Sequence, residues 1–422
     1  MSSDPDDSMV RPKTFQCPTC GTPLQIGTDP SLQCPSCGNT VLIPSKYRSQ
    51  QPQQPQFVFQ PMMPAFDMPN VDQMVRRGQR MGLIITIVIL VFTFAIVGFS
   101  LLATNSFSQS FTADLQNTIG NITNGIPNIS IPNVTIPASG KVPTAVPLAG
   151  VILEFGGKGS GAGLFDDSRY IAVDKEGSIF VADYQDGHVQ KFDPAGKFQL
   201  LINVPPDKND NVIIRGLAAD YQGNLYVSRG GDILKFSSAD GSLVQTMAGH
   251  FPDTYYDALV VDASNTLYAI HSSAGQDDLL KLDAKGKVLA RYKKIVSSVN
   301  KNDPAFNLEP VVDGVGNIYM ISEIGDQVYI YDKDGKFTNR FGEKGNQPGQ
   351  LDHPGPAVMD GQNRLIIFNS GRLDRFSASG RYLDGQTIGY AKGSPMGMAI
   401  DLDGNVYLVT NNGIVQKYQF GK

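Results

Sequence analysis

One pattern is repeated six times between residues 171 and 422, and it limits the possible folds more than any other feature of the chain. Its anchor is an aspartate that recurs every 41 to 51 residues, at Asp174, Asp220, Asp262, Asp313, Asp360 and Asp401. Three residues after each anchor comes Gly or Asn, the residues that tolerate positive φ most readily. Six residues after it comes Phe, Tyr or Ile, which suit a half-buried strand. Each copy therefore predicts a strand, a tight turn formed by the aspartate, and a second strand.

A third strand follows in every copy, and a fourth short strand follows in the first five, for example at 337–341. Four strands per repeat at this period indicate a β-propeller rather than a helical solenoid. The sixth copy reaches Lys422 without a fourth strand, whereas an unassigned strand, 151–155, precedes the first copy. We expect that strand to close the last blade, which predicts an all-β, six-bladed propeller over 149–422 with no free sheet edge at its seam.

The repeats resemble the NHL family. The resemblance rests on the VD-x-x-G-x-IYV core, on the Lys-Phe-Asp-x-x-Gly turn and on the segment FG-x-x-G-x-x-x-G-x-[LF]-D, which occurs at 155–166 and again at 341–352. It covers about 270 of the 422 residues. The resemblance implies an NHL-like propeller, a fold whose members include protein-binding, RNA-binding, sensor and enzymatic proteins.

The charge of the repeat region argues against nucleic acid as the ligand. Residues 150–422 contain 27 Lys and Arg against 33 Asp and Glu, a net charge of −6. Phosphate binding requires a basic face, so DNA or RNA binding is not expected.

Residues 15–46 contain all the cysteines of the chain, in two C-P-x-C-G sequences formed by Cys17, Cys20, Cys34 and Cys37. Two such pairs with 13 residues between them have close to the spacing of a four-thiolate zinc site. We therefore predict a zinc ribbon, similar to those at the ends of many prokaryotic proteins. A segment this short cannot fold on its own core, so the metal would supply most of the folding free energy. Two disulfides or a redox pair are the alternatives; a site closed by four thiolates is structural rather than catalytic.

Residues 81–103 are predicted to form a single transmembrane helix. The segment 82–103 contains 22 residues without a charge, enough at about 1.5 Å per residue to cross a bilayer. Arg76, Arg77 and Arg80 precede it, whereas the other flank carries no Lys or Arg before Lys141. The positive-inside rule places the N-terminus in the cytoplasm and the propeller outside it. We expect residues 1–14 to be disordered, 47–75 to be a Gln/Pro-rich linker and 104–148 to be a Pro/Asn-rich stalk.

Candidate site residues gather on the face of the propeller at which the first strand of each blade begins and the second strand ends. Leading into the first strands are Arg169, Arg215, Asp257, Glu309 and His353. Nine residues after the anchors, where the second strands end, are Asp183, Arg229, His271, Ser322, Asn369 and Thr410. A position that serves only the fold would be expected to carry the same residue type in every blade, whereas the residue nine positions after the anchor differs in every blade. We therefore predict a ligand site on this face. Its candidate residues are Arg169, Asp183, Arg215, Arg229, Asp257, His271, Glu309, His353 and Asn369. Solvated loop tips are the alternative.

The sequence predicts a binding protein rather than an enzyme. We expect a single-pass membrane protein that presents an extracytoplasmic propeller to a protein or glycan partner, as a scaffold or sensor, and carries a structural zinc ribbon in the cytoplasm. The alternative is a membrane-anchored, metal-dependent hydrolase, lactonase or lyase, in which Glu309, Asp257, His271 and Asn369 would hold an axial metal. The chain has only four histidines, and none are paired in a zinc-binding sequence, so a His-rich zinc centre is not expected.

Overall fold

A computed structural model describes residues 15–17, 20–27, 29, 31–44, 47, 149–247, 255–273 and 276–420. These residues form a small cysteine-containing ribbon and a propeller, which we describe separately. The predicted disordered N-terminus, the transmembrane helix and the stalk lie outside the described residues, as does the predicted linker except for Tyr47. Within the described ranges, no helix is long and apolar enough to cross a membrane.

The propeller consists of six four-stranded antiparallel sheets, so the predicted blade number is correct. Blade 1 contains β6 (Ser168–Val173), β7 (Ile179–Asp183), β8 (His188–Phe192) and β9 (Phe198–Asn203). Blade 2 contains β10 (Ile214–Ala219), β11 (Asn224–Arg229), β12 (Asp232–Ser237) and β13 (Leu243–Met247). Blade 3 contains β14 (Ala258–Val261), β15 (Leu267–Ser273), β16 (Gln276–Leu282) and β17 (Val288–Tyr292).

Blade 4 contains β18 (Leu308–Val312), β19 (Ile318–Ser322), β20 (Gln327–Tyr331) and β21 (Phe337–Phe341). Blade 5 contains β22 (Pro354–Met359), β23 (Arg364–Asn369), β24 (Arg372–Ser377) and β25 (Tyr382–Thr387). Blade 6 contains β26 (Pro395–Ile400), β27 (Val406–Thr410), β28 (Ile414–Phe420) and, as its outer strand, β5 (Ala149–Gly156).

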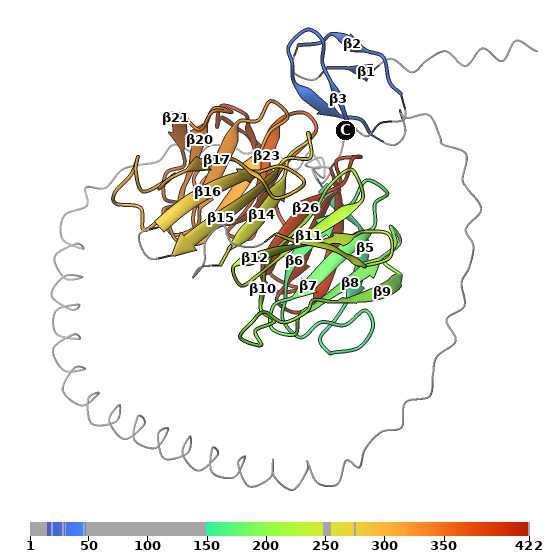
Figure 1. The fold of residues 1–422 in the computed structure, drawn as a ribbon. Helices are drawn as coiled ribbons and strands as arrows, with labels where there is room; N and C mark the ends of the chain where they lie inside the picture. The colour runs from blue at the N-terminus through green and yellow to red at the C-terminus, as the bar shows by residue number, and fades with distance from the viewer. Residues whose placement is uncertain are drawn as a thin grey trace, which may run out of the picture. The chain divides into compact units, whose positions relative to one another are not determined.

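The sixth blade joins the two ends of the propeller sequence. Strand β5 pairs antiparallel with β28, from Ala149 opposite Phe420 to Gly156 opposite Ile414. The first strand of the same blade, β26, packs beside β6 of blade 1, and Figure 1 shows the red C-terminal strand next to the green N-terminal ones. The chain therefore closes the ring with a strand from its beginning.

The anchor aspartates form the turns predicted for them. In blade 4, Oδ1 of Asp313 accepts the N–H groups of Val315 at 3.0 Å and Asn317 at 2.8 Å, and Oδ2 accepts the Tyr319 hydroxyl at 3.2 Å. The same pair of backbone bonds recurs in all six blades. The turn position three residues after the anchor has positive φ in every blade, including Asn265 and Asn363. This network explains why the repeat combines Asp, Gly or Asn, and Tyr.

The lysine of the third strand links neighbouring blades. Lys191 of blade 1 donates from Nζ to the carbonyl of Ser238 in blade 2 at 2.7 Å, and Lys235 of blade 2 reaches the carbonyl of Ala284 in blade 3 at 3.2 Å. Blade 4 has isoleucine at this position, and there the Tyr319 hydroxyl donates to the next blade instead. This lysine therefore joins neighbouring blades at Lys191 and Lys235, whereas Lys417 of blade 6 pairs with Asp401 of its own blade at 3.0 Å.

The ribbon consists of two short hairpins around a minimal core. Strand β1 (Phe15–Gln16) pairs with β2 (Pro23–Leu24), and β3 (Ser31–Gln33) pairs with β4 (Thr40–Leu42). Among the described residues of the ribbon, five form a buried apolar cluster, Cys17, Leu24, Cys34, Val41 and Ile43, against which Phe15, Ile26, Leu32 and Tyr47 pack. So small a core cannot stabilise a fold alone.

Candidate functional site

An axial pocket lies on the propeller face where the first strands begin. Its volume is about 360 Å³, and all six blades contribute to its wall. Ligand pockets range from about 300 to 1,000 Å³, so this one is suited to a small molecule or to a side chain inserted from a larger partner. The parts of its wall differ in chemistry: Arg169 and Tyr170 line it at blade 1, Asp257 at blade 3, Glu309 and Glu323 at blade 4, and Pro354, Pro356, Pro395 and Met396 at blades 5 and 6.

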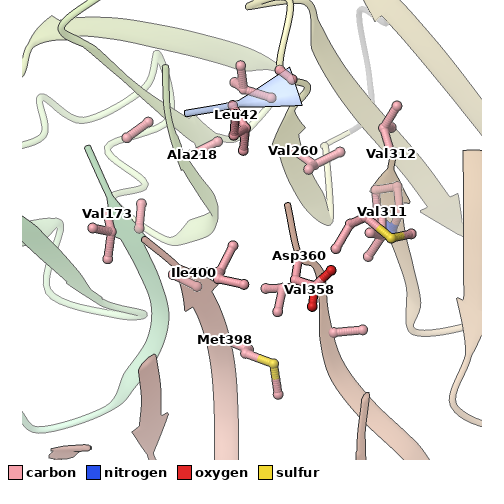
Figure 2. A pocket seen from close by; sticks show the side chains of 18 of the residues that line it. Leu42, Val173, Ala218, Val260, Val311, Val312, Val358, Asp360, Met398 and Ile400 are labelled. Carbon is pink, nitrogen blue, oxygen red and sulfur yellow. The ribbon is translucent and has the colours of Figure 1, made fainter. Parts of the chain in front are cut away.

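Beneath the axial pocket the first strands line an apolar channel. Figure 2 shows Val173, Ala218, Val260, Val358 and Ile400 around the axis, one from each of five blades, with Val311 completing the set from blade 4. Glu309 belongs to the walls of both the axial pocket and this channel. A carboxyl group is thus placed where the polar pocket meets an apolar interior.

The basic wall is a stack of arginine and tyrosine side chains. The guanidinium of Arg169 lies 3.7 Å from the ring centre of Tyr184, and that of Arg215 lies 4.0 Å from the ring centre of Tyr255. Arg169 also donates two hydrogen bonds of 2.9 Å to Asp167, and this ion pair raises the pKa of the arginine. Its positive charge is therefore already balanced by the protein.

Asp257 is the acidic member of this wall. It lines the axial pocket, and its Oδ1 lies 3.8 Å from Nη1 of Arg215. Arg215 stands beside the pocket rather than among its lining residues. The blade 1 to 3 side of the pocket therefore holds cations and anions in matched pairs.

The acidic wall is formed by Glu309 and Glu323. The side-chain amide of Asn307 donates to Oε2 of Glu323 at 2.9 Å, which fixes that carboxylate at the rim. Glu309 accepts the backbone N–H of Ala357 from blade 5. No arginine, lysine or histidine forms an ion pair with either glutamate within the described ranges. The two carboxyls are therefore the charges of the pocket that the propeller leaves unbalanced.

Buried acids shape the long segment between blades 3 and 4 that leads to these glutamates. Asp277 accepts the N–H groups of Val296 at 2.6 Å and Ser297 at 2.8 Å. Asp303 accepts the Tyr329 hydroxyl at 2.8 Å and the Ser322 hydroxyl at 2.9 Å. Because both ends of the segment are held in this way, the polar residue that follows it, Asn307, has a defined position.

Burial raises the pKa of Glu309 from 4.5 to about 7, a net effect to which the negative charge of Glu323 adds and which the Ala357 N–H opposes. The Glu309 side chain is half-buried: protein atoms pack around it, but it still borders the axial pocket. A carboxyl group in this state exchanges its proton near neutral pH, which is a property of functional sites.

Replacing Glu309 by glutamine is expected to stabilise the propeller at pH 8 and to have little effect at pH 4.5. The folded protein binds the Glu309 proton more tightly than the unfolded chain, so wild-type stability falls as the pH rises from 4.5 to 7. At about 1.4 kcal/mol per pH unit, the gain in the free energy of unfolding at pH 8 is at most about 3 kcal/mol. Urea unfolding of E309Q and wild type at both pH values measures it. Equal shifts at both values would contradict this assignment, and E343Q, an exposed substitution, is the control.

The residues at the ends of the second strands do not line the axial pocket. Asp183, Arg229, His271, Ser322, Asn369 and Thr410 are each at most 5% exposed. Several of them bind the loop that leads into their own blade: Asn369 donates to the carbonyl of Gln350 at 2.8 Å, and Nδ1 of His271 lies 2.8 Å from the carbonyl oxygen of Tyr255. These residues were expected to differ because they contact a ligand. The structure indicates instead that they differ because several of them hold different loops. The loops differ from blade to blade, so the groups that hold them differ too.

His353 is exposed at a different part of the face. Its Nδ1 lies 3.1 Å from Oδ1 of Asp352, and together with Asp326 these residues form one of two groups of three or more metal-ligating side chains in the described ranges. The other group is the four cysteines. Glu309, Asp257, His271 and Asn369 form no such group in the part of the chain that the structure describes, so it does not bring together the axial metal ligands of the enzymatic alternative.

The sequence analysis missed the pocket residue Glu323 and the two tyrosines that stack on the arginines at the pocket, Tyr184 and Tyr255. Tyr184 and Glu323 stand ten residues after their anchors, directly after the column that was singled out. Successive residues in a strand face opposite sides. Because Asp183 and Ser322 are buried, the residues that follow them, Tyr184 and Glu323, are expected to point the opposite way. Alignment on the anchors also shows that Glu309 is the only charged residue four positions before an anchor. Both signals are present in the sequence.

The four thiols of the ribbon converge and form no disulfide. The Sγ atoms of Cys17 and Cys37 are 3.7 Å apart, and those of Cys20 and Cys34 are 3.6 Å apart. Gly21 and Gly38 follow the second cysteine of each pair with φ of 73°, which turns the chain around the thiols. Four thiolates bound tetrahedrally to zinc at about 2.3 Å would have sulfurs about 3.8 Å apart. The donor set therefore fits this metal.

No protein-family model matches the chain, and neither does any curated protein. Among solved structures it is similar to selenomethionine-substituted virginiamycin B lyase from Staphylococcus aureus, with 9% identity over 65% of this chain and 100% of that one and a TM-score of 0.47. A luciferin-regenerating enzyme shares 14% identity over 65% and 95% of the two chains, with a TM-score of 0.48. The WD40 β-propeller domain of Doa1 shares 13% over 65% and 98%, with a TM-score of 0.44. At these identities the likeness concerns the propeller fold.

Proposed function

We propose that this chain is a single-pass membrane protein whose NHL-like propeller binds an extracytoplasmic protein or glycan partner through the axial pocket. The single observation that carries the proposal is the pocket itself, to which every blade contributes a different set of side chains. The anchor aspartates, which serve the fold, are the same in every blade, whereas the residues that line the axial pocket differ from blade to blade. The differing walls of the pocket are what selective binding of one ligand requires.

The membrane anchor and its orientation rest on the sequence. The uncharged segment 82–103 and the arginines before it support a helix that leaves the N-terminus in the cytoplasm. Protease added to intact cells would then degrade the propeller and spare the ribbon. Protection of the propeller in intact cells would reverse the orientation.

We infer that Cys17, Cys20, Cys34 and Cys37 bind one structural zinc ion. The sulfur separations of 3.6 and 3.7 Å and the absence of a disulfide support this inference. Four thiolates would leave no open coordination position, so the ion would hold the ribbon together rather than activate water. The ribbon is a second docking module or an N-terminal cap.

Site-specific photo-crosslinking tests the proposed role of the pocket. A photoreactive residue at Met396, which is 39% exposed at the pocket wall, is expected to capture a partner in intact envelopes. The matched control is Leu201 on the outer strand β9, with 44% exposure and no part in the pocket. A partner captured from Met396 and absent from Leu201 supports the proposal. Identical products from both positions, or none from Met396, would refute it.

Catalysis is a second candidate, favoured by one observation. Glu309 lines the axial pocket and has a pKa of about 7, as a general acid or base requires. A metal-dependent hydrolase, lactonase or lyase would in addition need a tightly bound ion in the propeller. Metal content of residues 148–422, purified without chelator, distinguishes the two candidates: about one bound ion per chain favours the enzyme, and none favours binding.

A further inference from the structure

We propose that the axial pocket recognises a primary amine on an apolar stem, the chemistry of a lysine side chain inserted from a protein partner. The inference deepens the proposed function, since it takes the axial pocket as the binding site and names what enters it. It rests on the charge balance of the wall, on the position of Glu309 and on the apolar side of the pocket at blades 5 and 6.

The first argument is the charge that remains after pairing. Arg169 is neutralised by its two-point contact with Asp167, and Asp257 faces Arg215. Glu309 and Glu323 have no cationic partner within the described ranges. A ligand that enters the pocket therefore meets two unbalanced carboxyls and no unbalanced cation, which selects a positive group over a negative one.

The second argument is the coupling between these carboxyls. The charge of Glu323 is near enough to act on Glu309, which adds to the effect of burial in keeping Glu309 protonated. A cation placed between the two would remove this repulsion and favour ionisation of Glu309. The binding energy of the cation and the proton affinity of Glu309 are therefore linked.

The third argument concerns the kind of cation. A divalent metal requires several oxygen ligands, six to eight for calcium. In the described part of the propeller, no third acidic or histidine side chain joins Glu309 and Glu323 in a metal-binding group. An ammonium group has only three donors to satisfy, and two carboxyls with one further acceptor are sufficient. The amine is therefore the better match.

The fourth argument concerns the rest of the ligand. Pro354, Pro356, Pro395 and Met396 form the side of the pocket at blades 5 and 6, and Glu309 sits at the top of the apolar channel. An amine at Glu309 would leave its stem against these residues. A lysine side chain combines four methylenes with a terminal ammonium and suits a pocket of about 360 Å³.

Calorimetric titration of the detergent-solubilised full chain at pH 8 tests the inference with matched probes. Nα-acetyl-lysine methylamide is expected to bind at least tenfold more tightly than its norleucine counterpart, which lacks only the amine. E309Q and E323Q are each expected to weaken binding of the lysine probe at least tenfold, whereas E343Q, at an exposed loop position, leaves it unchanged. Because glutamine keeps the size and shape of glutamate, the variants remain folded, and urea unfolding verifies this.

A proton measurement separates the proposed contact from a structural effect. At pH 6.5, binding of the lysine probe to wild type is expected to release protons, because the ammonium lowers the pKa of Glu309. The released protons make the observed binding enthalpy depend on the ionisation enthalpy of the buffer. The other charged groups that line the pocket are Glu323, Asp257 and Arg169, of which Glu323 acts on Glu309. E309Q must therefore abolish the buffer dependence, and E323Q must retain part of it.

Each remaining outcome decides the inference. Equal affinity for the lysine and norleucine probes, or full affinity in E309Q, overturns it, as does displacement of the lysine probe by micromolar Ca²⁺ or Mg²⁺. Binding of spermidine without binding of the lysine probe supports the amine site and assigns its source to a free polyamine. If Met396 captures a partner but neither amine binds, the proposed function stands and only the amine assignment fails.

Discussion

Replacing Cys34 by serine is expected to abolish zinc binding and to unfold residues 15–44. Cys34 is buried, and its Sγ lies 3.6 Å from that of Cys20. The described residues of the ribbon give an apolar cluster of five, two of them cysteines, so the proposed zinc ion would have to provide most of the stability. Structural zinc contributes about 10–16 kcal/mol of apparent binding free energy in comparable small modules, which makes this the largest effect that we expect of a single substitution.

Elemental analysis and limited proteolysis measure this effect. Wild type should contain one zinc ion per chain and resist cleavage within 15–44, and C34S should contain none and be cleaved there. S36A, at an exposed position between the two cysteines of the second pair, is the control and should retain the metal. A ribbon that stays protected after chelation, or that contains disulfides as isolated, would show that zinc does not hold it.

Replacing Asp313 by alanine is expected to lower the free energy of unfolding of the propeller by about 4 kcal/mol. Its carboxylate accepts four hydrogen bonds: two from backbone N–H groups, one from Nδ2 of Asn317 and one from the Tyr319 hydroxyl. Each contributes about 1 kcal/mol net, and the loss leaves buried donors unsatisfied. Urea unfolding monitored by circular dichroism measures the loss.

The chain contains a matched control for this substitution. Asp332 forms the same turn, with Oδ1 accepting N–H groups two and four residues later at 3.0 and 2.9 Å, but its turn is exposed. D332A should therefore cost only about 1 kcal/mol. If the two variants were equally destabilised, the buried Asp–Asn–Tyr contacts would add nothing to the turn, contrary to our account of the repeat.

The sequence was sufficient to predict the propeller because its turns are local. The spacing of Asp313, Gly316 and Tyr319 encodes one hydrogen-bonded unit, and six copies specify six blades. Each C-P-x-C-G pair of cysteines is likewise local, although the two pairs meet across 14 positions of sequence. Turns and motifs built from residues two to six positions apart are therefore readable without a structure.

The candidate site was predicted only in part, because a repeat alignment gives the height of a residue in its blade but not the direction of its side chain. Arg169, Asp257 and Glu309 were expected at this face, and all three line the axial pocket. His271 and Asn369 are at the same height but turn toward loops. The loops vary in length, so the partner of each such residue cannot be read from the period.

The strand that closes the ring also has a mechanical consequence. The proposed membrane anchor and stalk precede Ala149, the first residue of β5, so a pull between the membrane and a bound partner would reach this strand before any other. Seven residue pairs join β5 to β28, and Gln386 of blade 5 donates a further hydrogen bond of 2.7 Å to the Ala149 carbonyl. The seam would therefore set the load at which the whole propeller opens, and its strength under force would be that of one strand pairing rather than of six blades.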